Sequence, residues 1–374
     1  MILLAVKDQQ RSLFAPAEKF LKNNCMGLLE KLYARKVVSP ESVDLSNIRS
    51  ILVIRQHDQL GDFLLATPVL RALRERFPEA TIGLLVREYF HDVARALPTV
   101  DDVLVFYENG LHWTWRRVSS LHRSLRKGWD LTVVLNSVSH SLTSDLLAHF
   151  SRAKYVLGSD ERIFPGCSRN FFYNLLAPQG DEPRHQTERN LDIVRLLGVD
   201  TLDRTLRISI SEEERNVAGR FLEAKGFKPG ITAIGMHIGA GKPLNRWPVK
   251  RFAELAKALT ARYAAQIVLF WGPYEEELKR IFHAQAETGT VDAGHSNLRM
   301  LASLFARCDA IVCNDTGIMH LGAATGVPVA ALFGSARPEE WKPFGDNVRA
   351  IRAESGKVED IRVEDVMVAL EGFI

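Results

Sequence analysis

The segment from Asn314 to His320 carries residue types that could bind a phosphate group. It follows a short apolar run typical of a buried strand, and parallel sheets bind ligands at the carboxyl ends of their strands. A helix beginning there would offer unpaired backbone N–H groups, to which Thr316 adds a hydroxyl and Gly317 a close approach. His320 follows one helical turn later. An ordinary helix cap by Asp315 or Thr316 is the alternative, but a cap needs neither the glycine nor the histidine.

A second segment, Gly239 to Pro248, combines small residues with positive charge. Small residues allow the backbone to approach a phosphate, and Lys242 and Arg246 could neutralise it. The GxxxxGK[ST] spacing of a P-loop is absent, so this turn is a weak signal by itself.

A third segment, Trp271 to Glu277, places Glu275 just beyond another predicted strand. A carboxylate in that position could accept hydrogen bonds from ribose hydroxyls. A helix with an acidic first turn, which suits the helix dipole, explains the same residues equally well.

A fourth segment, Gly61-Asp62, lies at the first strand–helix junction of the chain. The carboxylate of Asp62 could take a proton from an attacking hydroxyl. Taken alone, a helix cap is the simpler interpretation of this aspartate.

These four segments, in this order, resemble glycosyltransferase family 9, the lipopolysaccharide heptosyltransferases, which have the GT-B fold. The similarity runs from about residue 51 to the C-terminus. The residues that carry it are Leu60-Gly61-Asp62 with Thr67-Pro68, Arg246-Trp247-Pro248, Trp271-Gly272-Pro273 with Glu275, and Asp315-Thr316-Gly317 with His320.

The resemblance implies that Asp62 is the catalytic base and that Glu275 binds the ribose of a nucleotide-sugar donor. The full set of donor-binding candidates is Lys242, Arg246, Glu275, Asp315, Thr316, Gly317 and His320. The family usually has a lysine two positions before the tryptophan, where this chain has Asn245. Arg246 and Lys242 are therefore alternative sources of the phosphate-binding cation.

The activity that the resemblance implies is an inverting, metal-independent transfer of heptose from ADP-heptose, or a related nucleotide sugar, to a lipopolysaccharide inner-core acceptor. We expect no cofactor and no metal, because no DxD motif or clustered His/Asp set lies between the halves. Asn136, Ser137 and His140 are the candidates for binding the acceptor. The basic run from Arg116 to Lys127 could meet its phosphates, although a solvated helix face is the simpler interpretation.

Two other functions remain as alternatives. A sugar-nucleotide epimerase of the GT-B type would need additional acid and base groups in the donor half, which the sequence does not show. A non-catalytic nucleotide-sugar binding module would have no need of Asp62. A dinucleotide dehydrogenase is disfavoured because no GxGxxG follows either opening strand.

Strand and helix patterns alternate along the chain, which predicts an α/β protein with two doubly wound, Rossmann-like domains facing across a cleft. Residues 1–47 are expected to form an N-terminal helical extension. Residues 48–208 should form an acceptor-binding domain, and residues 209–374 a nucleotide-sugar-binding domain.

Composition limits the environment and the partners. The net charge of +3 over 374 residues is too small for a general nucleic-acid binder. Four scattered cysteines and the lack of a long apolar run predict a cytosolic protein.

Apolar residues recur at helical spacing between Phe14 and Tyr33, with lysines and arginines among them. The favoured interpretation is a helix packed on the first domain. The alternative is a basic amphipathic segment in peripheral contact with the cytoplasmic face of the inner membrane.

Overall fold

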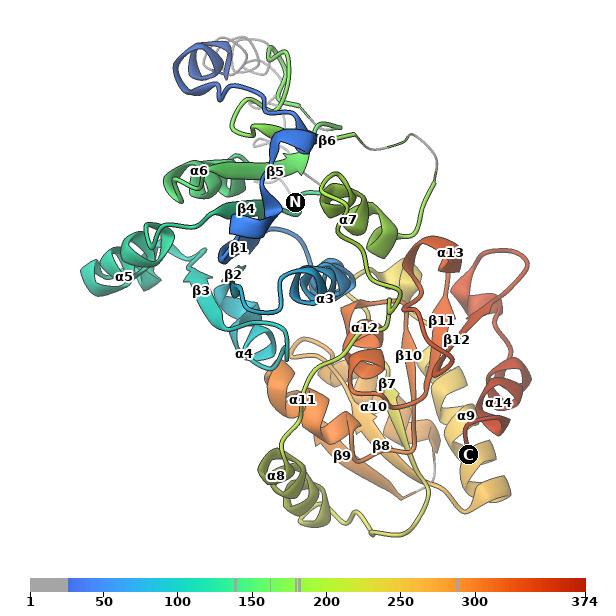
Figure 1. Cartoon of the computed structure of the whole chain (residues 1–374). Coiled ribbons are helices and arrows are strands. Elements are labelled where there is room, and N and C mark those ends of the chain that lie inside the picture. Colours follow the sequence, from blue (N-terminus) through green and yellow to red (C-terminus); the bar gives the residue numbers. More distant parts are fainter. Residues whose placement is uncertain (1–25, 138–139, 162, 179, 181–182, 287–288) are drawn as a thin grey trace, which may run out of the picture.

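Two parallel β-sheets, one in each half of the chain, form the framework of the protein (Figure 1). The computed structural model describes residues 26–374 except 138–139, 162, 179, 181–182 and 287–288. All pairings between neighbouring strands in these residues are parallel. The predicted α/β class with two doubly wound halves is confirmed.

The N-terminal half contains the first sheet and the helices on its two faces. Its strands are β1 (Ser50–Arg55), β2 (Thr81–Arg87), β3 (Asp102–Phe106), β4 (Leu131–Val134), β5 (Tyr155–Ser159) and β6 (Leu175–Ala177). Its helices are α2 (Leu60–Leu65), α3 (Thr67–Arg76), α4 (His91–Ala94), α5 (Trp115–Leu125), α6 (Leu142–Phe150) and α7 (Gln186–Arg195). The strand order is β3-β2-β1-β4-β5-β6, so the order reverses beside β1, where such sheets bind ligands.

The C-terminal half repeats this plan. Its strands are β7 (Ala233–His237), β8 (Gln266–Phe270), β9 (Thr290–Gly294), β10 (Ala310–Asn314), β11 (Val329–Phe333) and β12 (Val348–Arg352). Its helices are α8 (Glu212–Glu223), α9 (Val249–Tyr263), α10 (Glu276–Ala286), α11 (Leu298–Phe305), α12 (Gly317–Ala324), α13 (Pro338–Trp341) and α14 (Val363–Glu371). The strand order β12-β11-β10-β7-β8-β9 reverses beside β7.

Central strands were predictable because both faces of the sheet are covered. The side chains of β1 from Ile51 to Ile54 are fully buried, as a run of β-branched and aliphatic residues requires. Peripheral elements escaped prediction, among them β5, β6, β9, β12, α8, α13 and α14. β6 has only three residues and β12 is partly exposed with two arginines, so neither shows a continuous apolar pattern.

The sequence from Phe63 to Phe77 has one continuous helical pattern, but the structure contains two helices in this region. α2 ends at Leu65, and α3 begins at Thr67 with Pro68 in its first turn. Proline lacks the N–H that a continuous helix needs and is tolerated in a first turn, so the break follows from the sequence. The earlier start of α2 places Gly61 and Asp62 inside a helix.

The two halves are in direct contact where α2 packs against α12. One apolar cluster contains buried side chains from both halves, such as Phe63 and Met319. The segment that connects the halves, residues 196–211, also forms backbone hydrogen bonds with each of them. Within it, the N–H of Ile208 donates to the carbonyl of Ala324 at 3.0 Å, and the N–H of Ser209 to that of Ala96 at 2.8 Å.

Residues 26–33 form a helix that packs on the N-terminal half. The ring of Tyr33 meets that of His149 edge-on, with centroids 5.1 Å apart, and the Arg35 guanidinium donates to the carbonyl of Ala153 at 2.6 Å. This agrees with the packing interpretation for residues 26–47, whereas the predicted pattern before residue 26 lies outside the described residues. None of the described helices has the length and apolarity to cross a membrane.

Candidate active site

A cavity of about 350 Å³ opens at the carboxyl ends of β7, β8 and β9, beside the start of α12. The N-terminal half contributes Tyr89 to its wall, so the cavity lies where the halves face each other. Its lining residues are Tyr89, His237, Ala240, Gly241, Trp271, Gly272, Pro273, Glu275, Gly294, His295, Ser296, Leu298, Leu301, Thr316 and Ile318. Three of the four predicted segments contribute to this region, because carboxyl ends of parallel strands meet at one edge of a sheet.

Glu275 is held against the floor of the cavity. Its Oε2 accepts the backbone N–H of Gly272 at 2.6 Å, and its side chain is 15% exposed. A Cβ atom on Gly239 would lie only 1.7 Å from that oxygen. Gly239 is therefore required for the position of this carboxylate, a reason for the glycine that the sequence did not show.

The side chain of Arg246 contacts the turn that follows β7. Its guanidinium donates to the carbonyl of Ala240 at 2.8 Å and lies 3.9 Å from Oε1 of Glu275. Asn245 ends the short 3-10 helix η5 (Pro243–Asn245), so the family's lysine position is occupied by a neutral side chain in a turn. Arg246 is thus beside the cavity wall, whereas Lys242 is exposed and faces Asp315.

The loop before α12 contains a carboxyl group with a raised pKa, that of Asp315. Burial raises the pKa of Asp315 to about 6, and the positive charge of Lys242 opposes this rise. Thr316 is the N-cap of α12, and its hydroxyl accepts the N–H of Ile318 at 3.3 Å. The capping alternative is therefore realised by Thr316, which also lines the cavity.

His320 lies beneath the contact between the halves and is absent from the cavity lining. A Cβ atom on Gly61 would be 2.8 Å from the His320 ring, and a Cβ on Gly317 would be 2.8 Å from the Cβ of Leu60. Two glycines thus permit α2 and α12 to approach closely. Burial lowers the pKa of His320 to about 3, so the ring is neutral at pH 7 and supplies no positive charge to a phosphate.

Asp62 occupies the third position of α2, next to this contact. Its Oδ2 accepts the backbone N–H of Gln59 at 3.1 Å, which completes a capping box. Its Oδ1 is buried without a hydrogen-bond partner. Burial raises the pKa of the Asp62 carboxyl, an effect that the charge of Arg55 partly offsets. The residue therefore caps a helix with one oxygen and keeps the other available as a proton acceptor.

The acceptor candidates differ in their accessibility. Ser137 is fully buried and donates to Oδ1 of Asn190 at 2.9 Å, and Asn136 is 6% exposed. His140 is the most accessible of the three. Its Nε2 lies 2.6 Å from Oδ2 of Asp145, and its ring stacks on Phe164. With its side chain 11% exposed, His140 is the least buried of the three.

His237 is a cavity residue that sequence reasoning missed. It is the last residue of β7, is 8% exposed, and its Nδ1 is buried without a hydrogen-bond partner. Burial lowers the pKa of the His237 ring, which favours the neutral form. Its place at the end of a central strand was the signal that could have found it. Tyr89 and His295 lacked such a signal.

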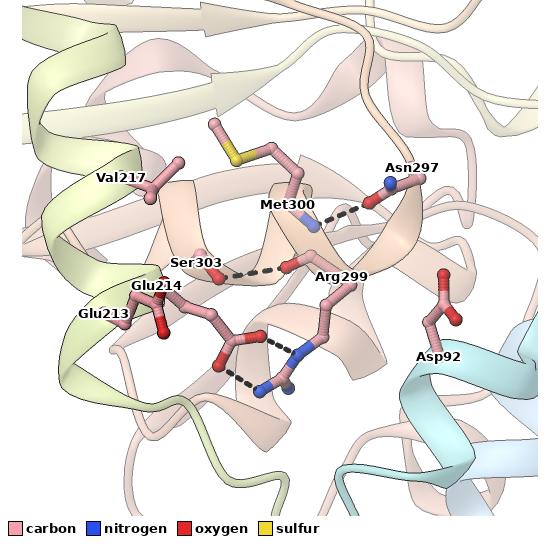
Figure 2. Close-up of a pocket in the computed structure, with 8 residues that line it drawn as sticks. All are labelled: Asp92, Glu213, Glu214, Val217, Asn297, Arg299, Met300 and Ser303. Carbon is pink, nitrogen blue, oxygen red and sulfur yellow. Dashed lines mark hydrogen bonds and ion pairs between the residues drawn. The ribbon is translucent and has the colours of Figure 1, made fainter.

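A second cavity, of about 270 Å³, lies between α8 and α11, with Asp92 of α4 nearby (Figure 2). The guanidinium of Arg299 makes two hydrogen bonds to the carboxylate of Glu214, each 2.5 Å long. This ion pair joins α8 to α11, so we assign this cavity a structural role. Among the described residues, no group of three or more His, Cys, Asp or Glu side chains is arranged to hold a metal ion.

Two Rossmann-like halves that meet at such a cavity have the arrangement of the GT-B fold. Residues 118–370 match glycosyltransferase family 9 (heptosyltransferase). A curated relative, lipooligosaccharide heptosyltransferase 2 of Haemophilus influenzae, is 24% identical over 82% of this chain and 89% of its own length. The chain belongs to glycosyltransferase family 9 and is a transferase, as the sequence predicted.

Two solved structures are similar over most of their lengths. A family 9 glycosyl transferase from Veillonella parvula has a TM-score of 0.75 and 26% identity, with 87% of this chain and 97% of that chain covered. The ADP-heptose lps heptosyltransferase II of E. coli has a TM-score of 0.70 and 25% identity, with 87% and 98% covered. The GT-B fold is confirmed.

Proposed function

We propose that this protein transfers a heptose from ADP-heptose to the inner core of lipopolysaccharide, with inversion at the anomeric carbon and without a metal. Support for the sugar and the acceptor comes from relatives whose names specify heptose and lipopolysaccharide or lipooligosaccharide. Support for the donor comes from the cavity, in which a carboxylate, a capped helix start and a nearby arginine suit the ribose and diphosphate of ADP.

The observation that carries the mechanism is the free, buried Oδ1 of Asp62 next to the contact with α12. The acceptor hydroxyl oxygen forms a bond to the anomeric carbon and loses its proton to Asp62. The bond from that carbon to the β-phosphate oxygen breaks on the opposite face, and its electron pair leaves with ADP. A raised pKa makes Asp62 a stronger proton acceptor than an ordinary aspartate.

The charge that develops on the leaving diphosphate needs stabilisation, generally the largest single contribution to such reactions. Arg246 and Lys242 provide positive charge beside the cavity, and α12 begins there with the positive end of its helix dipole. His320 is neutral, and we assign it to the packing that positions Gly61 and therefore Asp62.

The test is Asp62→Asn, which removes proton acceptance but keeps an oxygen that can bond to the N–H of Gln59. We expect ADP affinity and melting temperature close to the parent, with turnover lowered by about 10²–10⁴-fold. Asp58→Asn is the matched control, since Asp58 also lies near Arg55, at 3.3 Å, but belongs to the preceding loop. A folded Asp62→Asn protein with full transfer activity would refute the mechanism.

A further inference from the structure

Three exposed apolar residues lie close together in sequence, between the end of β3 and the first turns of α5 in the N-terminal half. Leu111 is 90% exposed, Trp115 82% and Val118 42%. Leu111 belongs to the short 3-10 helix η4 (Gly110–His112), and the other two lie in the first turn of α5. We call these three residues the α5 patch. A tryptophan so exposed is unfavourable in water, which indicates that a partner covers it.

The chain around the patch is strongly basic. Residues 109–129 contain five lysines and arginines and no aspartate or glutamate, so this stretch alone exceeds the net charge of the whole chain. Two of the five are engaged. The guanidinium of Arg117 lies 4.2 Å from the centre of the Tyr107 ring, and Lys127 pairs with Asp102 at 2.5 Å. Arg116, Arg123 and Arg126 make no ion pair with a described carboxylate.

Helical spacing orients these charges beside the apolar residues. Trp115 and Val118 are three residues apart and both are exposed. Leu125, two helical turns beyond Val118 on the same side of α5, is buried, so Val118 lies at the rim of the exposed face and Trp115 lies further out on it. Arg116 and Arg123 are seven residues apart, which places them in a row flanking that face. Figure 1 shows α5 at the outer end of the first sheet, beside the edge strand β3 and away from the C-terminal half.

We propose that the α5 patch docks on the surface of an anionic lipid bilayer. Trp115 and Leu111 enter the headgroup region, where the amphipathic indole is favoured, and Arg116, Arg123 and Arg126 contact lipid phosphates. A groove of about 260 Å³ between α5 and β3, lined by arginine and serine side chains, adds polar groups that suit a headgroup.

Charge complementarity favours this occupant over a second copy of the chain. Two identical patches meeting face to face would bring two sets of unpaired arginines together, which is repulsive. An anionic membrane satisfies both the apolar and the basic side chains at once. The inference deepens the proposed function, because a lipid-linked acceptor resides in a membrane, but it rests on the surface of the N-terminal half and not on the active site.

The experiment is co-sedimentation of the full chain with vesicles of phosphatidylcholine alone or with phosphatidylglycerol added. We expect binding only to the anionic vesicles, weakened at high salt by screening. The double substitution Arg116→Gln/Arg123→Gln should reduce the partition coefficient by about 25-fold, roughly fivefold for each charge. Leu111→Ser/Trp115→Ser should also release the protein, and should remove the quenching of tryptophan fluorescence by brominated lipids.

Matched controls are Leu202→Ser, at a leucine that is 99% exposed, and Arg220→Gln, at an exposed arginine of α8. Both should bind vesicles like the parent, and circular dichroism should show all variants folded. Undiminished binding of the two patch variants would overturn the proposal, as would a lipid-free dimer that these variants abolish. Because the assay contains neither sugar nucleotide nor acceptor, its outcome is independent of whether the protein transfers heptose.

Discussion

The most quantitative prediction concerns Asp315, whose carboxyl group has a pKa raised by burial from an ordinary 3.8 to about 6. Since the folded protein holds this proton more tightly than the unfolded chain, ionising Asp315 destabilises the fold. The destabilisation is absent below pH 3.8, grows between pH 3.8 and about 6, and is complete above. Asp315→Asn removes a group that ionises without greatly changing its shape.

The size of the effect follows from the two pKa values. At pH 7.5 the ionised carboxylate costs the folded state about 3 kcal/mol, and at pH 4.5 only about 1 kcal/mol. Asparagine does not ionise, so any other effect of the substitution on the free energy of unfolding is the same at both pH values and cancels in their difference. The free energy of unfolding of Asp315→Asn relative to the parent should therefore increase by about 2 kcal/mol from pH 4.5 to pH 7.5.

Urea unfolding followed by circular dichroism at several pH values measures this difference. Asp346→Asn, at an exposed carboxylate in the same half, controls for the loss of one negative charge. Parallel stability curves for the parent and Asp315→Asn across this range would show that the Asp315 carboxyl is not perturbed by its surroundings. The assignment of a largely buried anion at the start of α12 would then be wrong.

Two further predictions concern the donor cavity. Gly239→Ala places a methyl group 1.7 Å from the Glu275 carboxylate and should weaken ADP binding at least tenfold by calorimetry. Gly289→Ala, at an exposed glycine with open space outside the cavity lining, should not. Equal affinities would remove Glu275 from the ADP site. Arg246→Ala should lower turnover more than Lys242→Ala, because Arg246 reaches the cavity wall and Lys242 is exposed. The reverse order would assign the phosphate-binding cation to Lys242.

The segments that line the candidate cavity could be predicted in large part because their signal is local. Glu275 lies five residues after the apolar strand β8 and Thr316 two residues after β10, and residues just beyond strand ends meet at one edge of a parallel sheet. The reversal of strand order beside β1 and β7 then places this edge toward the opposite half. The spacing of such residues along the chain was sufficient to bring them together.

Contacts between distant segments could not be predicted in the same way. The need for glycine at residue 239 arises from Glu275, which is 36 positions later, and the need at residue 61 from His320 in the other half. The helical position of His320 suggested that it faces the phosphates, but packing of α2 against α12 buries its ring instead. The burial of Ser137 under Asn190 likewise depends on how α7 returns to the first sheet.

The apolar cluster shared by the two halves couples the stability of one half to ligand binding in the other. Opening either half would expose apolar surface of the other, so we expect the described chain to unfold as one cooperative unit. A nucleotide bound to the C-terminal half then stabilises strands of the N-terminal half that it never touches. On ADP binding, the exchange of backbone amide hydrogens should become slower in β7 and α12, and also in α2 and β1. Hydrogen exchange in the N-terminal half would therefore report ADP bound to the C-terminal half.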